Sequence, residues 1–316
     1  MNVSRYFASR CLQIVPVLLV ISALTFFLVH VLPGDLVVAR LGANATPDDV
    51  ARLRKQLNLD DPLFVQYFRW LGNVVSGHPG TSLVSNQPVG PLLWRRIPVT
   101  LELVGMATAI AIAIGIPMGV YSAFRPGTPG DYVVRFVAVL GQAVPNYWLG
   151  VIALTYLSIY FAWVPPTSYQ SPFENIGHNL QQFALPAFIT GYALAAVLMR
   201  FTRASVLAVL HEDYVRTATA KGLNRYAITF RHILRNAMIP VVTLIGIQFA
   251  TLVGGTVIIE AVFSLPGVGT LTLQAIESRD YAQIQFNVVV IALFVLIFNL
   301  LVDASYLMLD ARVRND

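Results

Sequence analysis

Six segments of the chain are each long and apolar enough to cross a lipid bilayer, and this feature limits its fold more than any other. A spanning helix takes about 20 mostly apolar residues. The six segments are residues 11–32, 99–123, 133–163, 183–200, 240–263 and 285–309. The sequence therefore predicts an all-α polytopic membrane protein with six transmembrane helices. It also predicts a single domain over residues 1–316, because no repeat, low-complexity tract or linker divides it.

The composition supports the same class. Of the 316 residues, 56% are hydrophobic and only 12% are charged, whereas soluble domains carry about 25% charged residues. The net charge of +5 could suggest a nucleic-acid partner. In a membrane protein, an excess of cations in cytoplasmic loops explains this charge better, so we expect the lipid bilayer and no nucleic acid as a partner.

The placement of lysine and arginine predicts that both termini are cytoplasmic. The two terminal tails and the loops 123–135 and 200–239 together carry 13 of these cations, whereas the loops 164–182 and 264–284 carry only Arg279. Short cytoplasmic loops hold the excess of positive charge in membrane proteins. The loop 200–239 is therefore expected in the cytoplasm, and the loop 33–98 outside.

The outer loop 33–98 is expected to contain two helices. The sequence TPDD at 46–49 places a capping residue, a proline and two acids in the order of a helix start. A second start, Asp61-Pro62, precedes LFVQYFRWLGNVVSG, which predicts an aromatic amphipathic helix. We expect this helix to lie against the membrane or to cap the bundle, with simple packing as the alternative.

The cytoplasmic loop 200–239 is expected to be structured rather than a tether. Its apolar residues recur at helical steps of three or four; they are Tyr214, Ala218, Gly222, Tyr226, Phe230, Ile233 and Leu234. Glycine costs a helix about 1 kcal/mol relative to alanine, so Gly222 indicates a helix end, a sharp turn or a close backbone approach. Two short helices meeting near Gly222 would present a basic surface, either to anionic lipid headgroups or to a soluble cytoplasmic partner.

The sequence holds no catalytic or metal-site pattern. The five histidines do not cluster and lack the spacing of metal ligands. The phosphate-binding pattern G-x-x-x-x-G-K-[ST] is missing, since neither lysine, Lys55 or Lys221, follows a glycine. We therefore expect no cofactor in this chain.

Polar residues within the predicted spans are candidates for functional roles. Charged residues are costly in a bilayer and are usually functional or paired, which selects Glu102, Glu260 and Asp303. Glu102 and Glu260 could instead lie at the outer interface, and Asp303 is expected to pair with a loop arginine. The candidates for lining a translocation pathway are Gln142, Asn146, Gln248, Thr251, Gly254 and Asn299. Each of these could equally serve helix packing within the chain.

The loop sequence resembles the cytoplasmic EAA loop of ABC-importer permeases. The positions of the E-A-A motif hold Arg216, Thr217 and Ala218, but DYVRTATAKGL at 213–223 and RHILRNAMIP at 231–240 are similar to the dipeptide/oligopeptide/nickel branch, the binding-protein-dependent transport inner-membrane components. Further similar stretches are LPGD at 32–35, LDDPLFVQYFRWL at 59–71, PVTLEL at 98–103, PNYWLG at 145–150, GGTVIIEAVFSLPGVG at 254–269, RDY at 279–281 and NLLVDASY at 299–306. The chain departs from the family at 77–80, where GHPG replaces the usual GDLG.

The resemblance implies a permease subunit of an ATP-driven importer in a bacterial cell membrane, carrying di- or oligopeptides inward. It implies a coupling helix that docks on an ATPase through Asp213, Tyr214, Arg216, Thr217, Ala218, Lys221, Gly222 and Leu223. The implied partners are a second homologous permease, two cytoplasmic ABC ATPases that bind the ATP and Mg, and an extracytoplasmic solute-binding protein. Nickel chelates or glutathione are alternative cargoes. An ion-coupled secondary transporter is less favoured, because no intramembrane ionisable relay or inverted repeat is visible.

Overall fold

The computed structural model describes residues 3–31, 37, 41, 46–56, 58–82 and 84–309. In this part of the chain the secondary structure is helical, with one isolated bridge between Thr81 and Pro88 and no β-strand. The LPGD stretch at 32–35 and the residues beyond 309 lie outside the described residues.

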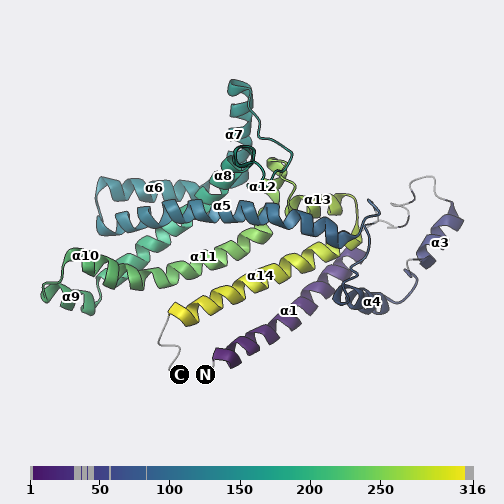
Figure 1. Cartoon of the computed structure of the whole chain (residues 1–316), viewed down its shortest axis with the longest axis horizontal. Helices are drawn as coiled ribbons and strands as arrows, with labels where there is room; N and C mark the ends of the chain where they lie inside the picture. The colour runs from purple at the N-terminus through teal and green to yellow at the C-terminus, as the bar shows by residue number, and fades with distance from the viewer. Residues whose placement is uncertain are drawn as a thin grey trace.

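Five of the predicted spans are single long helical segments, which make up the body of the molecule in Figure 1. They are α1 (Val3–Val31), α5 (Val89–Phe124), α8 (Ile176–Leu210), α11 (Arg235–Gly255) and α14 (Tyr281–Leu309). The predicted fold class, an all-α protein with long apolar helices, is confirmed.

The third predicted span, 133–163, is not one straight helix. It consists of α6 (Pro129–Ala143) and α7 (Asn146–Phe161), which meet at an angle of 92°, and Figure 1 shows α7 projecting away from α6. The break falls at Val144-Pro145, where Val144 is extended, with φ −96° and ψ 124°. Proline disfavours the helical conformation of the preceding residue and lacks an N–H donor for the helix. The third predicted span is therefore a bent pair of helices.

Shorter helices join the spans at both ends. They are α3 (Pro47–Gln56), α4 (Leu63–Val75), α9 (Asp213–Ala220), α10 (Arg225–Ala227), the π-helix η1 (Ile228–Leu234), α12 (Val257–Val262) and α13 (Val268–Glu277). The loop 200–239 is consequently shorter than predicted, because α8 continues to Leu210 and η1 leads directly into α11. The fifth span, predicted to end at 263, ends at Gly255.

The core forms where α5 and α8 pack along each other, as Figure 1 shows near its centre. A Cβ atom on Gly119 would lie 2.7 Å from the carbonyl oxygen of Met199, and one on Gly191 would lie 2.7 Å from that of Ala107. Only glycine permits such a close approach of two helix backbones, which is how apolar helices associate in membranes. The α5–α8 pair is the framework on which α6 and α11 pack.

The two helices predicted in the outer loop are present as α3 and α4. Asp49 N donates to Thr46 Oγ1 at 3.2 Å, as expected of a helix cap. The α4 helix packs on α1 through Tyr67, which is buried and whose hydroxyl lies 2.9 Å from Ser22 Oγ. Phe64 and Phe68 remain exposed on α4, which gives this helix the aromatic face expected at a membrane interface.

Candidate coupling site and translocation surface

The α9 helix lies at the end of α8 and packs on the bundle through two small residues. Val215 and Ala218 are buried against a cluster that includes Val206, Ile228 and Ile233. They are three residues apart, so they share one face of the helix. The remaining candidate coupling residues are exposed: Asp213, Tyr214, Arg216, Thr217, Lys221, Gly222 and Leu223. Ala218 is thus the exception among the eight, because its contacts are internal.

The turn after α9 explains Gly222. The backbone N–H of Gly222 donates to the carbonyl of Thr219, and that of Leu223 donates to the carbonyl of Ala218, at 3.0 and 3.3 Å. This pair of bonds closes a helix with a left-handed residue after it, and Gly222 has φ +74°. No atom outside its immediate neighbours would meet a Cβ at Gly222. Of the alternatives left by the sequence, Gly222 therefore serves a helix end with a sharp turn, not a close approach within this chain.

A second helical segment leads from the turn into the fifth span. Asn224 caps it by accepting a hydrogen bond from the backbone of Tyr226 at 3.0 Å, and α10, η1 and α11 follow without a break. Asn236 Nδ2 donates to the Tyr214 hydroxyl at 2.8 Å and so ties α9 to the start of α11. The seven residues of η1 form a π-helix, a rare form that is frequent at functional sites.

We call residues 213–227 the coupling segment. Its exposed surface combines cationic and apolar side chains. On this segment and the adjoining η1–α11 start, the exposed cations are Arg216, Lys221, Arg225, Arg231 and Arg235. The exposed large apolar side chains are Tyr214, Leu223, Tyr226 and Phe230, and the rings of Tyr226 and Phe230 lie 4.4 Å apart. A structured surface with apolar residues among charges is suited to a protein partner.

A buried ion pair fixes the spans beside the coupling segment. Arg203 of α8 contacts Asp131 of α6 with two hydrogen bonds of 2.9 and 3.1 Å, and Asp131 is 1% exposed. The Ser122 hydroxyl and the Gly127 N–H also donate to the Asp131 carboxylate. Arg203 was expected in a loop but lies on α8, so α5, α6 and α8 are held together where α8 leads into α9.

The acidic candidates Glu102 and Glu260 both have hydrogen-bond partners within the chain. Glu260 is 0% exposed and accepts from the hydroxyls of Thr100 and Thr256, at 2.7 and 3.0 Å, and from the backbone of Thr270 at 3.0 Å. Glu260 is therefore paired within the chain, where it joins α12 and α13 to α5.

Glu102 lies on α5 and accepts from Tyr169 at 3.0 Å and from Asn179 at 2.5 Å. Burial, together with this carboxylate, raises the pKa of Tyr169 to about 12, so the phenol remains a donor at neutral pH. The loop before α8, residues 162–175, is thereby attached to α5. The side chain of Asp303 lies outside the described residues.

The six pathway candidates do not converge on one pocket inside the chain. Thr251 and Gly254 lie on an exposed face of α11, Asn299 is exposed on α14, and Gln248 is half-buried on α11. Asn146 begins α7, and its side chain accepts from Tyr147 N. Gln142 is held by Arg200, as described below.

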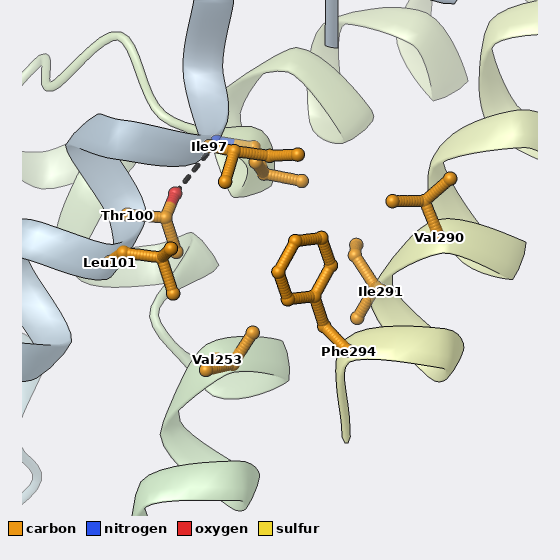
Figure 2. Close-up of a pocket in the computed structure, with 8 residues that line it drawn as sticks. Ile97, Thr100, Leu101, Val253, Val290, Ile291 and Phe294 are labelled. Atoms are coloured by element: carbon orange, nitrogen blue, oxygen red, sulfur yellow. Dashed lines mark hydrogen bonds between the residues drawn. The ribbon is translucent and has the colours of Figure 1, made fainter. Parts of the chain in front are cut away.

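A small pocket between α5, α11, α13 and α14 is apolar, as Figure 2 shows. Its lining residues are Ile97, Thr100, Leu101, Val253, Val268, Val290, Ile291 and Phe294. The Thr100 hydroxyl already accepts from Val268 N at 2.9 Å, and the Phe294 ring projects into the space. This pocket has no free polar group for a hydrophilic cargo. Within the described residues, no group of three or more His, Cys, Asp or Glu side chains is placed to hold a metal ion.

Two family descriptions match the chain. "Binding-protein-dependent transport system inner membrane component" matches residues 115–315, and the description of the N-terminal part of the same membrane components matches residues 3–104. The chain belongs to this family. It is therefore a multi-pass inner-membrane protein and a permease subunit of a binding-protein-dependent transport system.

Similar proteins match it over nearly the whole length. The oligopeptide transport system permease protein AppB of Bacillus subtilis is 38% identical, over 98% of this chain and 99% of that protein. A putative peptide permease protein of Brucella ovis is 40% identical, over 98% of this chain and 99% of that protein. The dipeptide transport system permease protein DppB of Alkalihalophilus pseudofirmus is 32% identical over the same shares.

Solved structures confirm the fold. A chain of the MetNI methionine ABC transporter in an inward-facing conformation superposes with a TM-score of 0.57, at 19% identity, over 71% of this chain and 98% of that chain. A chain of an amino acid ABC transporter superposes with a TM-score of 0.56, at 14% identity, over 69% of this chain and 94% of that chain.

Proposed function

We propose that this chain is the transmembrane permease subunit of an ATP-driven ABC importer that moves di- and oligopeptides inward across the bacterial cytoplasmic membrane. The observation that carries the mechanism is the coupling segment, an exposed surface built on a helix that is packed rigidly between the fourth and fifth spans. The peptide cargo is supported by relatives that are named oligopeptide, dipeptide and peptide permeases.

In this proposal two ABC ATPase subunits hold the ATP and Mg, and this chain, a single domain over 1–316, binds no cofactor. The exposed residues of α9 and the turn contact one ATPase. Val215 and Ala218 attach α9 to the bundle, and Tyr214 links it to α11 through Asn236. Because α9 is fastened on both sides, movement of the ATPase would be passed to α8 and α11 as a rigid-body shift.

The pathway would lie between this chain and a second, homologous permease, with an extracytoplasmic binding protein delivering the cargo. The apolar pocket of Figure 2 offers no route through this chain. Thr251 and Gly254 face outward from α11, where a second subunit could meet them. Gln142, Asn146, Gln248 and Asn299 remain candidates for the same lining.

The cation distribution supports cytoplasmic termini and an outer 33–98 loop. An impermeant thiol reagent applied from outside should label a cysteine introduced at position 55 and not one at position 221, in a background without Cys11. Labelling at 221 alone would reverse the orientation.

The function is tested by uptake in proteoliposomes that contain the complete transporter. Radiolabelled trialanine should accumulate only with ATP and the binding protein, and a nickel chelate and glutathione should accumulate much more slowly. Uptake that proceeds without the ATPases, driven by an ion gradient, would contradict the proposal.

A further inference from the structure

Arg200 stands out among the described cations by its position within a span, and no acidic side chain of the described residues pairs with it. It lies on α8, where no residue of the described stretch 189–199 is exposed, and Arg200 is itself exposed. No carboxylate of the described residues lies within ion-pair distance of it. Its Nη1 donates to Gln142 Oε1 at 2.7 Å, and Gln142 Nε2 donates to the Ala196 carbonyl at 3.2 Å. Arg200 is thus oriented by a neutral side chain that leaves its positive charge uncompensated.

Arg203, one helical turn further along α8, provides the contrast. Its charge is matched by the buried Asp131 at the start of α6. Arg200 and Arg203, which lie three residues apart on the same helix, therefore have different roles. Arg203 stabilises the packing, whereas Arg200 keeps a charge available at the surface.

The direction of the Arg200 side chain indicates what faces it. Gln142 lies eleven residues beyond Asp131, roughly 16 Å further into the span at 1.5 Å per residue. A lipid-facing arginine directs its guanidinium toward the nearer headgroup layer. Arg200 instead reaches toward Gln142, into the span, where an exposed charge is tolerated only beside water or a charged ligand.

The groove beside Arg200 is lined by both cationic and apolar side chains. Its volume is about 650 Å³, and it is lined by Tyr132, Arg135, Phe136, Val139 and Arg200. Arg135 is also exposed, and its guanidinium lies over the Tyr132 ring, 4.7 Å from the centroid. Two arginines therefore line this groove together with aromatic and aliphatic side chains, and guanidinium groups form strong paired hydrogen bonds with carboxylates. This composition suits a carboxylate that is carried on a partly apolar chain.

We propose that Arg200, oriented by Gln142 and assisted by Arg135, forms a carboxylate-binding station in the translocation pathway, where it contacts the C-terminal carboxylate of a peptide in transit. This inference rests on the proposed function. Open exposure keeps the contact weak enough for release, as a transport site requires. The station would make the permease favour peptides with a free carboxylate.

The test compares three variants in the complete transporter in liposomes. Arg200→Gln should lower kcat/KM for trialanine uptake at least tenfold, with an unchanged melting temperature and unchanged binding-protein affinity. Arg200→Lys, which keeps the charge but not the planar fork, should recover most of the rate. Arg125→Gln removes another exposed arginine outside the groove and should change uptake by less than twofold.

Equilibrium dialysis of the transporter in zwitterionic nanodiscs, without binding protein, identifies the ligand group. Trialanine should bind at least tenfold more tightly than its C-terminal amide, and Arg200→Gln should abolish this difference. Equal binding of the two forms by the wild type would overturn the inference. A defect of Arg200→Gln that occurs only in vesicles containing phosphatidylglycerol would also overturn it, because the groove would then hold a lipid phosphate. If the wild type carries no peptide at all, the proposed function fails instead.

Discussion

Two aspartate–arginine pairs lie near the same end of this molecule, and they differ in almost every physical respect. Asp131 and Arg203 make two hydrogen bonds, and the side chains are 1% and 23% exposed. Asp213 and Arg216 on α9 make one contact of 3.4 Å, and the side chains are 95% and 78% exposed. The first pair joins three helices, whereas the second joins two residues of a single helical turn.

The difference separates residues that hold the helices together from residues that are available to a partner protein. A buried pair is strongly destabilising to break, because the remaining charge loses its partner in a place that water reaches poorly. An exposed pair contributes little to stability, so its residues are free to exchange partners. The coupling segment therefore combines a fixed backbone, held through Val215, Ala218 and Tyr214, with side chains that a second protein can engage.

The largest effect is expected from breaking the buried pair. Asp131→Ala leaves Arg203, the Ser122 hydroxyl and the Gly127 N–H without their acceptor, and we expect a loss of roughly 2–4 kcal/mol. Thermal melting of the purified protein should show a clearly lowered midpoint. An unchanged midpoint would mean that the pair does not hold the three helices together.

Two glycines of α11 extend the comparison to the fifth span. A Cβ on Gly246 would collide with Val302 of α14, whereas a Cβ on Gly254 would meet only Ile291 Cγ2, at 3.8 Å. Gly246→Ala should destabilise the protein by about 1–3 kcal/mol through overpacking. Gly254→Trp should leave the melting midpoint unchanged and block uptake, because the residue faces outward. Lost assembly in Gly254→Trp would remove this face of α11 from the pathway.

A smaller effect is expected at the turn of the coupling segment. Gly222→Val places a β-branched residue at φ +74°, which costs about 1–2 kcal/mol locally. Gly222→Asn should be tolerated, since asparagine adopts this conformation more readily. Uptake and copurification with the ATPases should fall for valine and persist for asparagine. Equal behaviour of the two variants would show that the left-handed turn is not what the partner requires.

The smallest effect is expected from the exposed pair. Asp213→Ala should not change the melting midpoint measurably, because both side chains are already hydrated. Any effect of Asp213→Ala should appear as a lower rate of ATP-coupled uptake, which is measured together with the rate of ATP hydrolysis. A lowered midpoint comparable to that of Asp131→Ala would remove the distinction between the two pairs.

Much of the fold follows from local patterns in the sequence. Apolar length predicted the spans, and TPDD at 46–49 predicted the start of α3, because both signals act through neighbouring residues. Contacts between distant segments could not be derived in this way. The pairing of Asp131 with Arg203, and the burial of Glu260 beneath α5, depend on which helices meet. The bend at Val144-Pro145 did have a local signal, the proline, but it was concealed within a continuous apolar run.

The most direct test of the central claim is site-specific photo-crosslinking in native membranes. A photoreactive amino acid at position 216, on the exposed face of α9, should form a covalent adduct with an ABC ATPase subunit. The same amino acid at position 68, on the exposed aromatic face of α4, should not. An adduct of position 216 with phospholipid alone would contradict this account, because the coupling segment would then be a lipid-binding surface and not a dock for the ATPase.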